Sequence, residues 1–220
     1  MTILALEFSS AQRSVAVVRP ANPQISAQAV ETGAGGTNAF RLIEKILAEA
    51  GAGREQIKVL AVGLGPGSYT GIRAAISIAQ GWQLARGVKL LGVSSVECLV
   101  AQAHADKIFG RVNVVIDAQR NEFYLASYNI SSSGWTEIEP LKITTLAGIR
   151  SRADAGEIWV GPEVTRWLPQ EKILFPAAAT LGRLAVGQGN FVSGDNLAPI
   201  YLRETNFVKS PPTRAGLEIR

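Results

Sequence analysis

The stretch GLGPGSYTG, residues 63–71, holds the residues most able to do chemistry. It follows the mostly apolar run 57–62 and leads into a helical pattern, so its glycines would expose backbone N–H groups at a strand-to-helix turn. A phosphate or another anion would be favoured at such a turn. Glycines there can also serve only to make a tight, well-packed corner, and the residues alone leave both interpretations open.

Three known mechanisms fit this stretch poorly. A P-loop needs a lysine after its last glycine, and no lysine lies between Lys58 and Lys89. A dinucleotide fingerprint needs a glycine where Ser68 stands. Ser68 also lacks the flanking glycines of a serine-hydrolase elbow, and His104 would be the only possible base. Nucleophilic catalysis is therefore not expected.

Two acidic residues stand where apolar strands should end. Glu7 follows residues 2–6, and Asp117 follows residues 112–116. Paired acids at the mouths of such strands commonly hold a metal or a water for phosphate chemistry. Strand-end acids also simply begin turns, and with only hydroxyl side chains beside Glu7 that simpler interpretation is preferred. The candidate nucleotide- or phosphate-binding residues are Glu7, Ser9, Ser10, Gly65, Gly67 and Ser68.

The pattern around these acids occurs twice. Each acid opens a polar turn that contains Gln-Arg, and the turn leads into a second strand, at 14–18 in one case and 122–128 in the other. The two acids are half the chain length apart. The repeat predicts two similar α/β units, residues 1–106 and 107–220, and the tail of the second unit could pack back on the first.

Helical and strand patterns alternate between these hairpins. Strands are expected at 57–64, 88–93, 136–143, 157–161 and 172–175, and helices at 38–50, 71–86, 94–105 and 177–186. This alternation predicts a mixed α/β fold with parallel strand pairs. The second helix contains many small residues, which would let another helix approach it closely.

Composition narrows the range of functions. Only 18% of the residues are charged, against about 25% in an average soluble domain, which favours a buried partner surface. The net charge is +4, but the basic residues are scattered and form no nucleic-acid-binding stripe. A single cysteine, Cys98, and a single histidine exclude an internal disulfide and a Cys/His zinc site. Without a leader or a membrane-length apolar run, a cytoplasmic protein is expected.

Five segments resemble the bacterial TsaB (YeaZ) family. They are residues 3–10, the loop 65–73, and residues 92–97, 117–124 and 199–203, and their order covers nearly the whole chain. The resemblance implies an actin-like ATPase (ASKHA) fold made of two RNase H-like α/β halves with mixed sheets. This agrees with the internal repeat.

The resemblance also implies a function. Family members help to make threonylcarbamoyladenosine next to the anticodon of tRNAs that read codons starting with A. In that family TsaB is the non-catalytic partner of TsaD, which transfers the threonylcarbamoyl group, and TsaE is an ATPase that joins them. The catalytic relative holds its metal through a paired-histidine motif, which one histidine cannot supply. We therefore expect no catalytic residue and no metal site in this chain.

The partners implied are TsaD, in a heterodimer, and TsaE, with tRNA reached through the complex and a homodimer formed by the chain alone. No cofactor is expected to be intrinsic to the chain, although ATP or ADP and magnesium could bind in the complex. Family partners dock through the first two helices, which carries over to Leu42, Ile46, Arg73, Ile76 and Gln80 as interface residues. The alternative is a stand-alone ATPase or glycoprotease-like peptidase of the actin-like superfamily.

Overall fold

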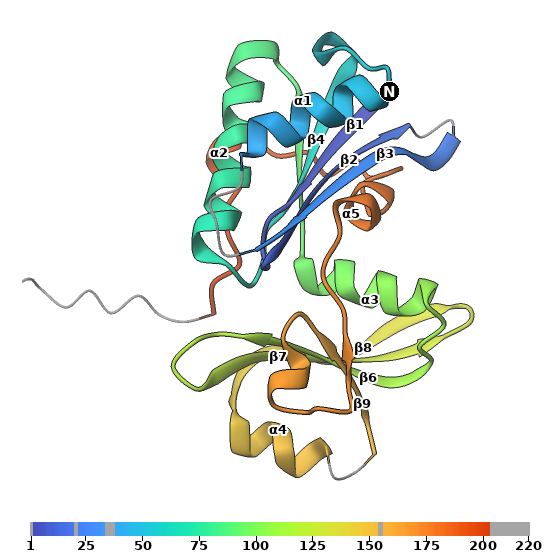
Figure 1. Ribbon diagram of the computed structural model, residues 1–220, viewed down its shortest axis with the longest axis vertical. Coiled ribbons are helices and arrows are strands. Elements are labelled where there is room, and N and C mark those ends of the chain that lie inside the picture. The colour runs from blue at the N-terminus through green and yellow to red at the C-terminus, as the bar shows by residue number, and fades with distance from the viewer. Residues whose placement is uncertain (1, 20–21, 34–37, 154–155, 203–220) are drawn as a thin grey trace, which may run out of the picture.

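Two five-stranded mixed sheets make up the computed structural model, which describes residues 2–19, 22–33, 38–153 and 156–202 (Figure 1). The strand order is β3-β2-β1-β4-β5 in the first sheet and β8-β7-β6-β9-β10 in the second. In the first sheet β2 pairs antiparallel with both β1 and β3, and β4 pairs parallel with both β1 and β5. In the second sheet β7 and β9 make the same two kinds of pair with their neighbours. The repeated topology confirms the duplication and the predicted fold of two RNase H-like halves.

The strands of the first sheet are β1 (Thr2–Glu7), β2 (Gln12–Arg19), β3 (Asn22–Thr32), β4 (Ile57–Gly63) and β5 (Lys89–Val93). Those of the second are β6 (Gly110–Asp117), β7 (Glu122–Ser131), β8 (Gly134–Thr145), β9 (Ile158–Gly161) and β10 (Lys172–Ile173). The helices are α1 (Ala39–Glu49), α2 (Tyr69–Arg86), α3 (Ser95–Ala105), α4 (Leu146–Ala153) and α5 (Ala178–Leu184). Short 3-10 turns, η1 to η3, lie at Arg54–Gln56, Val164–Arg166 and Gly194–Asn196.

The elements stack as alternating layers of helices and sheets (Figure 1). Helices α1 and α2 cover the outer face of the first sheet, α5 and α3 lie between the sheets, and α4 covers the outer face of the second. Strand β1 shows why both faces of a sheet must be apolar. Leu4 and Leu6 pack toward α1 and α2, whereas Ile3 and Ala5 pack toward α5.

The two halves of the chain exchange helices. Helix α3 precedes the second sheet in the sequence and packs on that sheet, whereas α5 follows the second sheet and packs back on the first. Beyond α5, the amide of Val192 donates to the carbonyl of Leu90, and the amide of Ile200 to that of Leu64. The predicted boundary between residues 106 and 107 remains a prediction, and the end of the tail, residues 203–220, lies outside the described residues.

Local side chains set where the helices begin. Asn38 accepts a hydrogen bond from the amide of Arg41 at 3.0 Å, and Ser94 accepts one from that of Val96 at 3.2 Å. Helix α2 ends at Gly87, whose φ of +65° is the left-handed conformation that glycine adopts at little cost. Among the described residues, no helix is both long and apolar enough to span a membrane.

The sequence did not predict β3 or α4. Strand β3 is an edge strand that pairs only with β2, so it needs less apolar surface than a central strand. Helix α4 buries only Ile149, too little to produce a helical periodicity in the sequence. Leu146 and Ala153 pack beside Ile149 on the same apolar cluster, and polar contacts complete the attachment of the helix.

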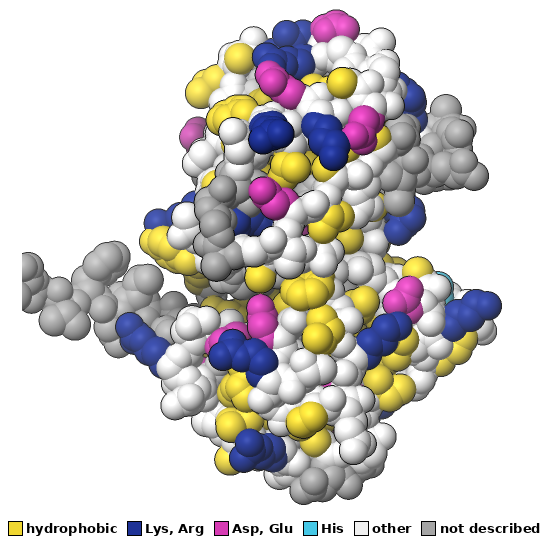
Figure 2. Space-filling view, in the orientation of Figure 1, with side chains coloured by type: hydrophobic (Ala, Val, Ile, Leu, Met, Phe, Trp, Pro, Cys, Tyr) yellow, Lys and Arg dark blue, Asp and Glu magenta, His cyan; other side chains and the backbone are white. Residues whose placement is uncertain are grey.

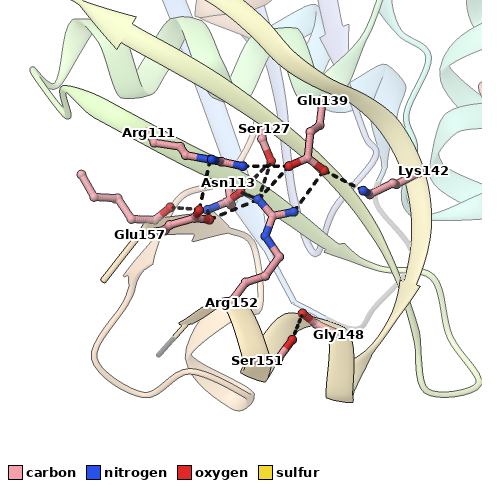
Figure 3. Close-up of polar contacts among 10 residues, drawn as sticks. Arg111, Asn113, Ser127, Glu139, Lys142, Gly148, Ser151, Arg152 and Glu157 are labelled. Atoms are coloured by element: carbon pink, nitrogen blue, oxygen red, sulfur yellow. Dashed lines mark hydrogen bonds and ion pairs between the residues drawn. The ribbon is translucent and has the colours of Figure 1, made fainter. Parts of the chain in front are cut away.

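A network around Arg152 holds α4 to the second sheet (Figure 3). Its Nη2 donates to Oδ1 of Asn113 at 2.9 Å and to Oγ of Ser127 at 3.1 Å, and it lies 3.1 Å from a carboxylate oxygen of Glu157. Asn113 and Ser127 are fully buried, so their polar atoms depend on partners within the protein. A second carboxylate, that of Glu139, lies 3.1 Å from the same guanidinium.

We expect Arg152→Ala to lower the free energy of unfolding by about 2 kcal/mol, because the buried Ser127 hydroxyl would lose its donor and Asn113 and Glu157 would each lose one of theirs. Arg150 is an exposed residue of the same helix, and Arg150→Ala should change stability by less than about 0.5 kcal/mol. Urea unfolding of both variants measures the difference. Equal stabilities would show that the network does not anchor α4.

Candidate functional site

A cleft of about 900 Å³ lies between the two halves of the molecule. Its walls come from residues 9–13 and 67–73 of the first half and residues 116–120 and 162–166 of the second, and Tyr201 closes one side. The two turns that follow β1 and β6 therefore face the same space. Because the halves repeat one topology, these turns occupy equivalent places in the two sheets.

The predicted phosphate-binding residues gather at the inner end of this cleft. Ser9, Ser10, Gly67 and Ser68 line it. Glu7 and Gly65 lie beneath its wall, where both are buried.

The carboxylate of Glu7 is fully buried and serves the fold. It accepts hydrogen bonds from the amide of Ser9 at 2.8 Å and from the hydroxyl of Ser95 at 3.0 Å, and that hydroxyl accepts one from the amide of Gly65 at 3.2 Å. Burial raises the pKa of Glu7, although the bonds from Ser9 and Ser95 oppose the rise. Glu7 thus links β1, the glycine-rich loop and the start of α3.

The two strand-end acids do not form one site. Asp117 lines the cleft, whereas Glu7 does not. Within the part of the chain that the structure describes, no group of three or more His, Cys, Asp or Glu side chains is placed to hold a metal. The simpler interpretation of Glu7, an acid that begins a turn, agrees with these positions.

The glycines of the loop permit backbone contact with the end of β1. A Cβ at Gly67 would lie 2.1 Å from the carbonyl oxygen of Ser9, and one at Gly71 would lie 2.0 Å from that of Phe8. The amide of Ser68 donates to the carbonyl of Ser9 at 2.6 Å, so it is already used within the fold. Close packing therefore accounts for these glycines without a bound phosphate.

Two glycines of α2 provide a direct test. Gly71→Ala should lower the free energy of unfolding by about 1–3 kcal/mol, because the new methyl group meets backbone that cannot move aside easily. Gly81 has open space around its Cβ position, so Gly81→Ala should raise stability by about 1 kcal/mol through helix propensity. Thermal or urea unfolding measures both. A harmless Gly71→Ala variant would refute the packing role.

The raised pKa of Glu7 predicts a pH dependence. Between the unfolded-state pKa and the higher folded-state pKa the unfolded chain loses a proton that the folded chain keeps, so Glu7 lowers stability as pH rises. Glu7→Gln removes this titration. The unfolding free energy of the variant should therefore improve relative to the unsubstituted protein as pH rises above about 4.5, the ordinary pKa of a glutamate. A difference that does not change with pH above this value would contradict the assignment.

An exposed cluster of two tyrosines and an arginine stands at the cleft. Tyr69 and Tyr201 stack with ring centroids 5.8 Å apart, and the guanidinium carbon of Arg73 lies 3.9 Å from the centroid of Tyr69. The Arg73 Nε donates to the Tyr201 hydroxyl at 3.2 Å. Sequence reasoning did not find this cluster, because Tyr201 is far in the chain from Tyr69 and Arg73, which lie one helical turn apart on α2.

The opposite wall contains a strained turn. Gln119, Arg120 and Asn121 all have φ near +60°, a conformation that side chains other than glycine adopt reluctantly. Asp117 stabilises the turn by accepting a hydrogen bond from the amide of Gln119 at 2.7 Å. Nearby, burial and then the charge of Asp117 raise the pKa of Glu163, while Arg166 opposes the rise.

Two of the five predicted interface residues are buried in the chain's own core. Ile46 is fully buried and Ile76 nearly so, and both pack beneath α1 and α2. Their side chains contribute little to the surface of the chain. Leu42 is half-buried against the same core, and Gln80 donates to the carbonyl of Gly194 at 2.9 Å. Of the five, Arg73 alone is exposed, and it belongs to the tyrosine cluster.

Other residues form the outer face of these two helices. On α2 the exposed positions include the small residues Ala74, Ser77, Gly81 and Ala85. Beside them Leu84 is 90% exposed. Phe40 of α1 is 65% exposed and borders a hollow of about 280 Å³ between the helices. The apolar periodicity of the sequence indicates the buried side of each helix, and the exposed side opposite it could have been inferred from the same pattern.

The single cysteine and the single histidine lie in apolar surroundings. Cys98 is buried, and burial raises the pKa of its thiol well above the usual range. The ring of His104 lies against those of Trp135 and Phe109, with centroids 5.4 and 6.3 Å away.

Comparison with known proteins identifies the family. Residues 36–157 match the family model of TsaD, described as tRNA N6-adenosine threonylcarbamoyltransferase. The tRNA threonylcarbamoyladenosine biosynthesis protein TsaB of Escherichia coli K12 is 30% identical over 188 residues, which cover 78% of this chain and 81% of that protein. The chain belongs to the TsaB family. It is therefore a member of the threonylcarbamoyladenosine biosynthesis machinery for tRNA.

Other relatives agree with TsaB membership. TsaB of Haemophilus influenzae is 33% identical over 127 residues, which cover 57% of this chain and 53% of that protein. Among solved structures, YeaZ from Pseudomonas aeruginosa superimposes with a TM-score of 0.75 at 24% identity, covering 91% of this chain and 99% of that one. This TsaB-family chain thus has the fold of YeaZ.

Proposed function

We propose that the chain is a non-catalytic subunit that binds a TsaD-type transferase and supports threonylcarbamoyl transfer to adenosine in tRNA, with TsaE as a further partner. The observation that carries the binding role is the bare outer face of α1 and α2, which nothing in the described part of the chain covers. We call this face, made of Phe40, Ala74, Ser77, Gly81, Leu84 and Ala85, the docking face.

The chemistry of the docking face suits another helix. Small side chains at Ala74, Ser77 and Gly81 let a partner backbone come close, and Leu84 offers an apolar side chain to fill a pocket on it. Gly81 lowers helix stability, yet its Cβ position has open space, so no contact with the residues that the structure describes requires a glycine. A partner helix that crosses α2 closely at this position would explain why a glycine is present.

The surroundings of the described side chains also favour a non-catalytic role. The Cys98 thiol is buried and hard to ionise, and His104 is packed between aromatic rings. At the inner end of the cleft, the Glu7 carboxylate and the Ser68 amide are used within the fold. We therefore assign any ATP or ADP with magnesium to the complex and not to this chain.

Leu84→Glu tests the docking face. The side chain is almost fully exposed, so the variant should fold normally but lose co-purification with the TsaD-type partner by at least about tenfold, because a charge would be buried unpaired. Ile173→Glu is the matched control, since Ile173 is an exposed apolar residue on β10. Its binding should be unchanged.

Activity is measured by reconstituting tRNA modification with TsaD and TsaE, with and without this chain. The modification should depend on the chain and be reduced by Leu84→Glu but not by Ile173→Glu. Undiminished partner binding by Leu84→Glu would refute the docking face, and modification that proceeds equally without the chain would refute the supporting role. If the variant loses only self-association, the docking face belongs to a homodimer.

A further inference from the structure

The cleft between the halves carries an excess of positive charge. Arg73, Arg120 and Arg166 line it from α2, from the β6–β7 turn and from η2, and Arg13 lines it from β2. The acids among its lining residues are Asp117 and Glu163. Figure 2 shows Lys and Arg side chains on both halves beside the waist that separates them.

Four arginines and two acids line the cleft, so the acids offset only part of the positive charge. Burial and the neighbouring carboxylate disfavour the charged form of Glu163, against the opposing effect of Arg166. An anion entering the cleft would therefore meet mainly guanidinium groups.

Aromatic surface adjoins these guanidinium groups. Tyr69 is 56% exposed and stacks on Tyr201, with Arg73 lying over its ring. Planar rings beside arginines are the combination with which proteins hold unpaired nucleotides, because bases stack on the rings while phosphates contact the cations. Both partners of Tyr69 in this cluster, Tyr201 and Arg73, also line the cleft.

The distribution of the arginines favours a strand over a single nucleotide. A compact phosphate site would use backbone amides at the inner end of the cleft, but those of Ser9 and Ser68 donate to Glu7 and to the Ser9 carbonyl. The cations instead come from separate elements on both walls. Spaced cations suit successive phosphates of a backbone.

We propose that this cleft binds a single-stranded segment of RNA, with phosphates on Arg120, Arg166 and Arg73 and a base stacked at the Tyr69–Tyr201 pair. The identity of the polyanion as RNA rests on the proposed function in tRNA modification. The strained turn at residues 119–121 holds Arg120 at the cleft wall.

Binding is measured by fluorescence anisotropy of the full chain with a labelled single-stranded RNA of twelve nucleotides and mixed sequence. Affinity should fall with salt with a logarithmic slope of about −2, because three phosphate contacts on a single strand contribute about 0.7 each. The double variant Arg120→Ala/Arg166→Ala should reduce the magnitude of this slope by about 1.4. Arg150→Ala/Arg183→Ala is the control, with the same change of charge on exposed residues of α4 and α5.

The aromatic contact has its own pair of variants. Tyr69→Leu should weaken RNA binding at least about fivefold, since it removes the stacking ring. Tyr69→Phe keeps the ring and should bind as the unsubstituted protein does. Unfolding curves for each variant confirm that the fold is intact.

Three results would overturn the inference: no measurable RNA binding, equal losses in the cleft variant and its control, or displacement of the RNA by ATP at concentrations that saturate the cleft. The last would assign the cleft to a free nucleotide. These outcomes are separate from those of the docking face, because RNA binding is measured on the isolated chain. A chain that binds its partner but not RNA keeps the proposed function and loses this inference.

Discussion

The close backbone contact between the glycine-rich loop and the end of β1 is the constraint on which the rest of the structure depends. Gly67 and Gly71 let this loop lie directly on the carbonyl groups of Ser9 and Phe8, and Glu7 fastens the same region to Ser95 at the start of α3. These contacts fix where α2 begins and how it runs across the sheet. They also use the Ser9 and Ser68 amides, which are therefore not free to bind a ligand in the cleft. The loop therefore has a structural role, and it contributes to function by fixing the position of α2.

The duplicated halves share a topology but have diverged at their corresponding turns. After β1, residues 9–11 lie against the glycine-rich loop, whose Ser68 amide donates to Ser9. In the second half, the strand that corresponds to β4 is β9, which ends at Gly161 and is followed by η2 rather than by a glycine-rich loop. In the β6–β7 turn three successive residues have left-handed backbone conformations, which cost free energy. Arg120 is one of the three, and its side chain is exposed. The turn after β1 is therefore closely packed, whereas the turn after β6 is polar, exposed and lines the cleft.

The sequence predicted what depends on local pattern. Apolar runs and capping residues such as Ser94 located most strands and helices, and the repeat led to the two-sheet fold. The edge strand β3 escaped because it pairs on one side only. Ile46 and Ile76, predicted at an interface, are buried in the core, because helical periodicity reports an apolar side without saying whether the chain itself or a partner covers it. The basic cleft escaped because its arginines are single residues on separate elements, which only the tertiary structure brings together.

Helix α2 connects the two surfaces to which we assign function. Its first turns contribute Tyr69 and Arg73 to the cleft, and its later turns contribute Gly81 and Leu84 to the docking face. The helix has 18 residues, which at 1.5 Å per residue gives a length of about 27 Å. Its buried side packs against the first sheet, and this packing sets its position relative to that sheet. A partner that docks on its outer face would therefore stand at a defined distance and orientation from whatever the cleft holds. In the proposed role of a non-catalytic subunit, setting this geometry would be a sufficient physical reason to be part of an assembly.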